Sequence, residues 1–229
     1  AGAQAACDDY GVEMTVYEAP NDVGEEISVI ENVINGAFDG MVIYPVDGDA
    51  EAPFLEQMTA AGRPTSGGAG FSNALSGQIS LDQYHYGEVI GEMAASWINE
   101  KLGGKANIVL MSEDKMEQSI LRGDGIQDTL EKLCPDATVV TREACFPTED
   151  GLNSMETLLT QRSDINVVVC CNDTIGLGAY QALVNEGYTG REDVAVFSAD
   201  FTDDVVKLIK EGDIYRGSVD IEPYWSGYA

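Results

Sequence analysis

Basic residues are scarce in this chain of 229 residues, which has 12 lysines and arginines against 40 aspartates and glutamates and a formal net charge of -28. Such an excess of negative charge repels the phosphates of nucleic acids and the head groups of anionic membranes. We therefore expect neither of these among its partners. The simplest explanation of the charge is a solvated acidic surface in a secreted or high-salt setting.

Long apolar runs and histidines are also missing. No stretch reaches the roughly 18 consecutive apolar residues that a membrane-spanning helix needs, so no membrane insertion is expected. The only histidine, His85, falls in the first turn of a predicted helix, where a surface or capping role is more common than general-base catalysis. Without a histidine set or a nucleophile elbow, the sequence predicts no metal site, no cofactor and no enzymatic activity.

The cysteines predict neither a zinc site nor a disulfide. Cys170 and Cys171 are adjacent on a predicted strand, so their side chains point to opposite faces and cannot bind one ion. Cys134 and Cys145 flank a predicted strand at 138–142, which holds their α-carbons well beyond the roughly 7 Å that a disulfide tolerates. We therefore expect unpaired, mostly buried thiols that act as small hydrophobic side chains.

A strand–helix–strand unit is predicted over residues 165–200. Residues 165–171 are a short valine-rich run typical of a strand buried on both faces, residues 175–186 have apolar side chains at helical spacing, and residues 194–198 form a second buried strand. Such units cross over right-handed, which brings both strand ends to one edge of a parallel sheet, where open α/β sheets bind ligands. The polar residues at these strand ends are Asn172, Asp173 and Asp200.

The first part of the chain repeats this layout. Residues 38–44 form a buried strand, residues 50–61 a helix, and residues 63–66 another strand that closes in Gly67 and Gly68. Each first strand is preceded by an amphipathic helix. Two copies of the arrangement predict an α/β fold with two Rossmann-like lobes, each built on a parallel sheet.

The two lobes are expected to be joined by two hinge crossings. Lobe 1 covers 1–82 and is rejoined by 221–229, whereas lobe 2 covers 83–220. Hinge motion at 81–83 and 220–223 is expected to close them on a ligand. The other predicted elements are a helix up to Tyr10, strands at 13–17, 78–81, 107–111, 138–142 and 214–219, helices at 26–35, 84–101, 119–133 and 151–161, a helix ending within 207–213, and the start of a helix at 225–229.

Several sequence segments follow one another in a characteristic order, namely GAQAACDDYGVEMTVYEAPND, IENVINGAFDGMVIYPVDGDA, RGDGIQDTL, VVCCNDTIGLGAYQAL and VAVFSAD. In this order and spacing they resemble the type I periplasmic sugar-binding proteins of ABC transporters, the ribose- and galactose-binding family. The chain opens in a predicted helix, where a doubly wound lobe normally begins with a strand. We therefore expect the family's first strand and its C-terminal portion to be absent.

The resemblance implies a set of ligand-binding residues. Arg122, at the head of the helix after the first strand of lobe 2, matches an arginine that donates to sugar hydroxyls. Asn172 and Asp200 match residues that hold the sugar, and Phe146 matches an aromatic that packs on the sugar ring. Asp173, next to Asn172, is a further candidate. Amide, carboxylate and guanidinium groups suit hydroxyls that both donate and accept, and an aromatic ring suits the apolar face of a sugar.

The sequence departs from the family pattern in lobe 1 and at the second crossing. Gly67 and Gly68 stand where many members have an Asp-Arg pair, and the family's glutamine near the second crossing falls at or beside Ile221. These three positions are therefore included in the expected site, but the identity of the ligand stays open.

The function that the resemblance implies is capture of a small sugar or related polyol between the two lobes and its delivery to an ABC permease. The protein is expected to act as a monomer outside the cytoplasm, in the periplasm or lipid-anchored outside the cell membrane. Two alternatives stay open. One is the effector-binding core of a lac-repressor-like regulator, which shares the fold but fits the negative charge poorly. The other is an enzyme that uses Asp173 and Asp200 as a carboxylate pair.

Each candidate residue also has a purely structural interpretation. Asn172 and Asp173 could form only the N-cap of the following helix, Asp200 could be only a turn residue, and Phe146 could belong to the core. The corresponding alternative for Arg122 is a surface ion pair with Asp124 or Glu117.

Overall fold

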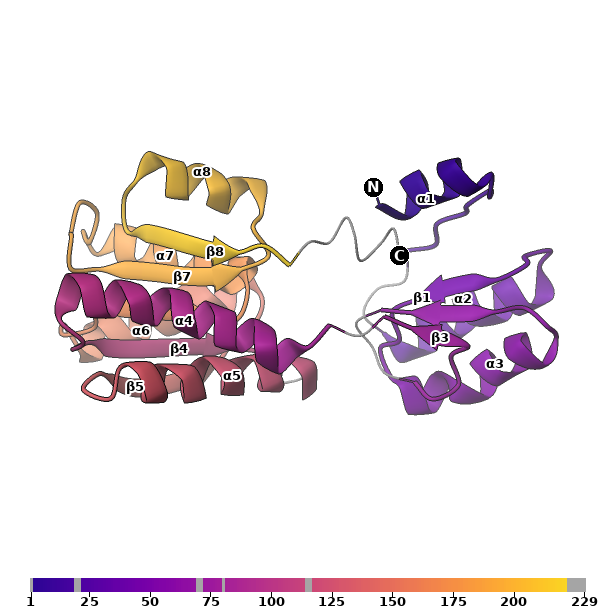
Figure 1. The fold of residues 1–229 in the computed structure, drawn as a ribbon, viewed down its shortest axis with the longest axis horizontal. Helices are drawn as coiled ribbons and strands as arrows, with labels where there is room; N and C mark the ends of the chain where they lie inside the picture. Colours follow the sequence, from indigo (N-terminus) through magenta and orange to yellow (C-terminus); the bar gives the residue numbers. More distant parts are fainter. Residues whose placement is uncertain (1, 19–21, 69–71, 80, 114–116, 222–229) are drawn as a thin grey trace. The chain divides into compact units, whose positions relative to one another are not determined.

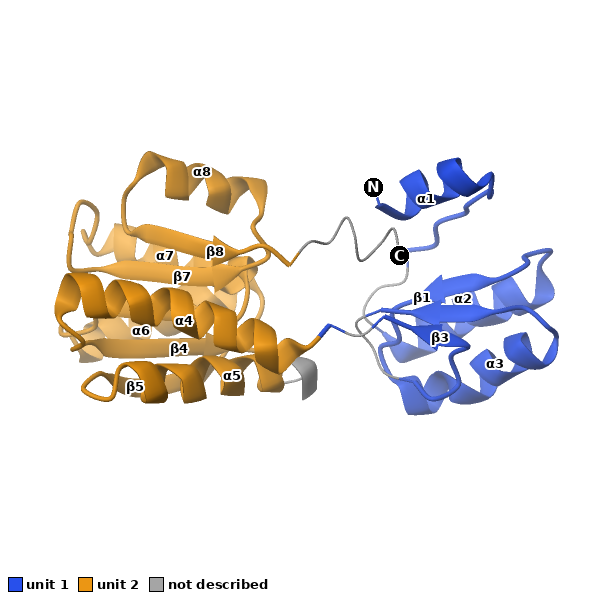
Figure 2. Ribbon diagram, in the orientation of Figure 1, with its two compact units in different colours: residues 1–81, 222–229 blue, residues 82–221 orange. Residues whose placement is uncertain are grey.

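The computed structural model describes residues 2–18, 22–68, 72–79, 81–113 and 117–221. The chain forms two compact units, Ala1–Leu81 with Glu222–Ala229 as unit 1 and Asp82–Ile221 as unit 2 (Figure 2). Each unit contains a parallel sheet and helices (Figure 1), so the predicted α/β class with two parallel sheets is confirmed.

Unit 1 is built around a three-stranded parallel sheet with the order β1-β2-β3. Its small core joins Ile30, Ile43 and Leu55, which come from a helix, a strand and the following helix. The elements of this unit are α1 (Gly2–Tyr10), α2 (Val23–Asn35), β1 (Met41–Ile43), α3 (Gly48–Ala60), β2 (Thr65–Gly67) and β3 (Gly77–Gln78).

The predicted strand at 13–17 is wrong. In the described structure this segment belongs to no strand, and Val16 is 72% exposed. Within the described part of the chain, the one backbone hydrogen bond of residues 12–18 joins Val12 N to Cys7 O, at 2.8 Å. An alternating apolar pattern forms a strand only where a neighbouring strand supplies hydrogen-bond partners, and β1 pairs here with β2 alone.

Unit 2 contains a five-stranded parallel sheet with the order β5-β4-β6-β7-β8. Helices α4 and α5 cover one face of the sheet and α6 and α7 the other (Figure 1). The elements are α4 (Gln83–Leu102), β4 (Asn107–Ser112), α5 (Glu117–Leu133), β5 (Thr138–Ala144), α6 (Thr148–Gln161), β6 (Val167–Cys170), α7 (Asp173–Asn185), β7 (Ala195–Ala199), α8 (Asp203–Glu211) and β8 (Tyr215–Val219).

The order of the strands creates a switch point at β4. From β4 the chain runs outward to β5, and then returns to the other side of β4 to form β6, β7 and β8. Ligand sites of open α/β sheets lie outside the carboxyl ends of the strands at such a point. All residues of β6 and β7 are buried, as their continuous apolar runs predicted. The predicted strand–helix–strand unit over 165–200 is therefore confirmed.

Two glycines set the distance between α4 and α5. A Cβ on Gly87 would lie 2.1 Å from the carbonyl oxygen of Arg122, and one on Gly125 would lie 2.2 Å from that of Tyr84. Both neighbours are backbone atoms, so only glycine permits this close approach. The crossing brings the first turn of α4 against the N-terminal half of α5, which carries Arg122.

None of the five cysteines, all of which lie in the described part of the chain, forms a disulfide, and four of them are buried, as predicted. His85 lies on the surface in the first turn of α4, where its Nδ1 is 3.1 Å from Glu88 Oε2. None of the described helices has the length and apolar character needed to cross a membrane. The predicted helix start at 225–229 lies outside the described residues.

Candidate functional site

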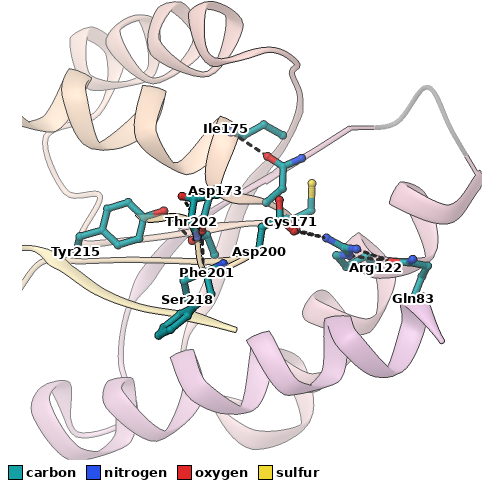
Figure 3. A network of polar contacts seen from close by, with 12 residues as sticks. Gln83, Arg122, Cys171, Asp173, Ile175, Asp200, Phe201, Thr202, Tyr215 and Ser218 are labelled. Carbon is teal, nitrogen blue, oxygen red and sulfur yellow. Dashed lines mark hydrogen bonds and ion pairs between the residues drawn. The ribbon is translucent and has the colours of Figure 1, made fainter. Parts of the chain in front are cut away.

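Arg122 lies part-buried at the carboxyl edge of the unit 2 sheet (Figure 3). Its Nε and Nη2 both donate to Gln83 Oε1, at 2.9 and 2.6 Å, and its Nη1 donates to the carbonyl oxygen of Cys171 at 2.8 Å. Nη1 also lies 3.6 Å from Asp200 Oδ1. The proposed surface pair with Asp124 is wrong, because Asp124 binds Arg142 instead; the side chain of Glu117 is outside the described residues.

Asp200 follows β7 and has an unusual backbone conformation. Its φ is 106° and that of Phe201 is 54°, although neither residue is glycine. Burial raises the pKa of Asp200 to about 6, and the charge of Asp173 adds to this, whereas Arg122 acts in the opposite direction. The carboxyl group therefore titrates closer to neutral pH than an exposed aspartate does.

Asp173 lies behind this edge and is fully buried. Its Oδ1 accepts from Ser198 Oγ and Ser218 Oγ at 2.5 and 2.7 Å, and its Oδ2 accepts from the backbone N and the Oγ1 of Thr202 at 2.7 and 2.8 Å. The carboxylate is 0% exposed and does not face solvent. Its hydrogen bonds to Thr202 hold the loop after β7. The hypothesis that Asp173 and Asp200 form a catalytic carboxylate pair is therefore wrong.

The network continues on both sides of Asp173. Ser198 Oγ lies 2.6 Å from the hydroxyl of Tyr215, and Ser218 Oγ accepts from the backbone N of Phe201 at 3.0 Å. Figure 3 shows how Asp173, Thr202, Tyr215 and Ser218 surround the start of the loop that carries Asp200. Side chains from β7, β8 and α7 thus fix the backbone at Phe201 and Thr202.

Asn172 caps α7. Its Oδ1 accepts from Ile175 N at 2.9 Å, so the capping role proposed for this residue is present. Within the described structure its Nδ2 makes no hydrogen bond, and the residue is only half-buried. Its amide can therefore cap the helix and still donate to a ligand.

Phe146 and Ile221 follow β5 and β8, the two outermost strands of the same sheet. Phe146 follows β5, is 36% exposed and precedes Pro147 through a cis peptide bond. Its ring is therefore not confined to the core. Ile221 follows β8 and packs partly buried against the core of unit 2. Arg122 and Asp200 form an ion pair, whereas among the described residues neither Phe146 nor Ile221 forms a hydrogen bond or ion pair with another candidate.

Gly67 and Gly68 belong to unit 1, at the end of β2. A Cβ on Gly67 would lie 2.4 Å from Leu75 Cδ1, and one on Gly68 would lie 2.2 Å from Tyr44 Cε1. Tyr44 follows β1 and is 51% exposed. The ring of Tyr44 thus occupies the place that a side chain at position 68 would take, and the carboxyl edge of unit 1 presents an aromatic group.

Two residues of these edges, Gln83 and Tyr44, were not predicted from the sequence. Gln83 directly follows Asp82, the N-cap of α4, so its polar character is consistent with a helix start and gives no further signal. Tyr44 continues an apolar strand, so its sequence pattern predicts a buried residue, whereas it is 51% exposed and lies beside Gly68. No group of three or more potential metal ligands occurs within the described residues.

The sequence is similar to proteins of known class. The family described as "Periplasmic binding protein domain" matches residues 1–229. A xylitol-binding protein of Mycolicibacterium smegmatis is 30% identical over 213 residues, which cover 91% of this chain and 59% of that protein. The ribose import binding protein RbsB of Bacillus subtilis is 28% identical over 205 residues, which cover 88% of this chain and 64% of that protein. The chain thus spans about three fifths of the length of these relatives.

Solved structures show the same fold. A periplasmic solute-binding protein of an ABC transporter from Actinobacillus succinogenes, with bound D-allose, has a TM-score of 0.86 at 21% identity, covering 98% of this chain and 80% of that chain. A carbohydrate transporter solute-binding protein from Agrobacterium radiobacter, in complex with D-arabinose, has a TM-score of 0.84 at 24% identity, covering 99% of this chain and 78% of that chain. At these identities the likeness concerns the fold. Because the family match extends over all of its residues, the chain belongs to the periplasmic binding protein family.

Proposed function

We propose that this protein binds a small sugar or related polyol and delivers it to an ABC permease outside the cytoplasm. The observation that carries the proposal is the cluster of Arg122, Asn172 and Asp200 at the carboxyl edge of β6 and β7, next to the switch point of the sheet. Permease delivery, a monomeric state and the hinges at 81–83 and 220–223 are parts of the proposal that come from the family resemblance.

The chemistry of the cluster suits hydroxyl groups. Arg122 uses Nε, Nη1 and Nη2 once each for Gln83 and Cys171, which leaves one N–H on each Nη. Asn172 offers its Nδ2 as a donor, and Asp200 offers carboxylate oxygens as acceptors. A polyol hydroxyl can accept from the guanidinium and donate to the carboxylate at the same time.

Each unit has an exposed aromatic ring at the carboxyl edge of its sheet. Phe146 in unit 2 and Tyr44 in unit 1 are both exposed enough to cover the apolar face of a sugar ring. In place of a charged pair, the end of β2 has two glycines and the neighbouring Tyr44 ring. Positions 67 and 68 therefore offer no charge, and the nearby aromatic group is the Tyr44 ring with its hydroxyl.

The named ligands of similar proteins support this class of ligand. Xylitol, ribose, D-allose and D-arabinose are all small molecules with several hydroxyl groups. These proteins are named for binding and transport, and not for catalysis or gene regulation. Their names favour transport over the lac-repressor-like alternative.

Calorimetric titration with D-ribose, D-allose, D-arabinose and xylitol tests the proposal. Binding without turnover supports it, and no binding to any of a wide panel of pentoses, hexoses and polyols contradicts it. Arg122→Ala is expected to weaken binding by about 2–5 kcal/mol, because a part-buried donor is removed and its partners stay unpaired. Arg191→Ala is the matched control, since Arg191 pairs with Asp193 in the turn that precedes β7. Unchanged affinity in a folded Arg122→Ala protein removes Arg122 from the site.

A further inference from the structure

Two buried glutamates of unit 1, neither of them a candidate ligand-binding residue, lie close to each other. Glu26 comes from α2 and Glu51 from α3, and they are 7% and 0% exposed. Glu26 Oε2 accepts from Val46 N, and Glu51 Oε1 accepts from Asp47 N, both at 2.9 Å. The two carboxyl groups therefore bind consecutive amides of the turn that follows β1.

The remaining oxygen of Glu51 lacks a donor. Glu51 Oε2 is buried and has no hydrogen-bond partner in the described part of the chain. A buried carboxylate oxygen without a partner is costly, and two neighbouring carboxylates repel each other. Either a proton or a bound cation has to compensate for this arrangement.

Within the described part of unit 1, no basic side chain is placed to provide the compensation. Arg63 is the only lysine or arginine in positions 1–81. Its Nη1 lies 3.3 Å from the carbonyl oxygens of Val33 and Gly36, at the C-terminal end of α2. Glu26 lies in the first turn of the same helix, so Arg63 is at the opposite end.

The other titratable groups at this end of unit 1 are acidic or neutral. Glu25 precedes Glu26 in α2, and Asp47 and Asp49 lie at the start of α3, where Asp47 Oδ1 accepts from the amides of Asp49 and Ala50. Strand β1 contributes no charged residue, and Tyr44 follows it. None of these groups neutralises the pair at neutral pH.

We propose that Glu26 and Glu51 share one proton and that this carboxyl–carboxylate pair positions the turn at 45–47, at the carboxyl edge of β1. When Glu51 Oε2 carries the proton, its O–H donates to the carboxylate of Glu26, and the oxygen that lacked a partner then has one. Glu26 Oε2 and Glu51 Oε1 remain free to accept from the amides of Val46 and Asp47. The hydrogen bond between a carboxyl group and a carboxylate is charge-assisted and therefore strong.

The titration of Glu51 is consistent with this geometry. Burial raises its pKa to about 7, and the nearby charge of Glu26 acts in the same direction, while the amide of Asp47 acts against both. Above this pH Glu51 ionises, and its repulsion of Glu26 loosens the turn. The turn follows directly on Tyr44, so the pair also sets where this ring lies. This last consequence for ligand capture rests on the proposed function, whereas the shared proton does not.

Carbon-detected NMR of the 229-residue protein, labelled with ¹³C at the glutamate carboxyl groups, tests the proposal without any ligand. We expect one carboxyl titration near pH 7 that disappears in Glu51→Gln and persists in Glu56→Gln, an exposed glutamate of the same helix. The amide signals of Val46 and Asp47 should shift with the same midpoint. Titration of Glu51 near its ordinary value of 4.5 overturns the proposal.

Two further measurements separate a proton from a metal ion and keep the test independent of sugar binding. At constant ionic strength, a midpoint that moves when calcium or sodium chloride replaces tetramethylammonium chloride indicates a cation site and overturns the shared proton. Glu51→Gln keeps both hydrogen bonds, since its Oε1 accepts from Asp47 and its Nε2 donates to Glu26. Its amide signals at 46 and 47 should therefore resemble those of the native protein at low pH and stay constant as the pH rises. Loss of sugar binding leaves all these results unchanged.

Discussion

Replacing Asp173 with alanine removes a fully buried carboxylate that accepts four hydrogen bonds from Ser198, Ser218 and Thr202. A hydrogen bond to a charged group contributes about 1.5–3 kcal/mol, but the loss is smaller than the sum of four such bonds, because the hydroxyl donors can rotate toward other partners. The backbone N–H of Thr202 cannot rotate and stays unpaired. We therefore expect the free energy of unfolding of unit 2 to fall by about 3–5 kcal/mol.

Asparagine at the same position should cost less. Its Oδ1 can still accept from the Thr202 amide, and its Nδ2 then faces the hydroxyl groups of Ser198 and Ser218, which can turn to accept. The loss is about 1–3 kcal/mol, since the charge is removed but each buried group keeps a partner. The structure therefore predicts an order of stability in which the native protein is followed by Asp173→Asn and then by Asp173→Ala.

Urea unfolding followed by the fluorescence of Trp97 measures these differences. Trp97 packs edge-to-face against Phe197, at 6.0 Å between ring centroids, and so reports on the core of unit 2. A Trp225→Phe background removes the only other tryptophan. Asp203→Ala, at an exposed position in the first turn of α8, is the control. The reasoning is refuted if Asp173→Ala unfolds at the urea concentration of the control, or if Asp173→Asn is as unstable as Asp173→Ala.

Two predictions concern the ligand. Because the pKa of Asp200 is raised, the folded protein retains a proton between pH 3.8 and about 6, and the free energy of unfolding falls as the pH rises through this window. Sugar affinity should rise over the same window, because the carboxylate becomes a full acceptor. Calorimetry should show this rise in the native protein and none in Asp200→Asn. Gly68→Ala places a Cβ 2.2 Å from Tyr44 Cε1 and turns the half-exposed ring away, so sugar affinity should fall while the melting temperature changes little. Gly77→Ala is the control. Its Cβ meets nothing within 4 Å, so it should leave the affinity and the melting temperature unchanged.

The sequence predicted the elements whose residues carry a local signal. The strands β6 and β7 are continuous apolar runs, and the helix between them begins at an asparagine cap, so the position of Asp200 at a sheet edge followed from the right-handed crossover alone. The strand at 13–17 has an equally clear alternating pattern and yet does not form. Its pattern specifies a face but not a partner, and pairing is a non-local property.

The environment of Arg122 could not be predicted either, because it too depends on residues that are distant in sequence. Its main partner, Gln83, is distant in sequence, and the two meet because Gly87 and Gly125 let α4 and α5 approach closely. In a sequence, glycines within a helix indicate only a lower helix propensity. Likewise, Asn172 and Asp173 are adjacent and both polar, but one lies half-buried at the helix cap and the other inside the core.

The backbone at Asp200 and Phe201 shows why the buried network matters for binding. Positive φ values at two consecutive non-glycine residues cost of order 1–3 kcal/mol each, so the loop needs hydrogen bonds to retain this conformation. Asp173 and Ser218 supply them through Thr202 N and Phe201 N. The carboxylate of Asp200 is thereby held 3.6 Å from Arg122 Nη1, longer than the roughly 2.7–3.2 Å of a good N–H···O hydrogen bond. A ligand hydroxyl that accepts from Arg122 and donates to Asp200 gains two short hydrogen bonds without reordering the loop, and so avoids an entropic cost of binding.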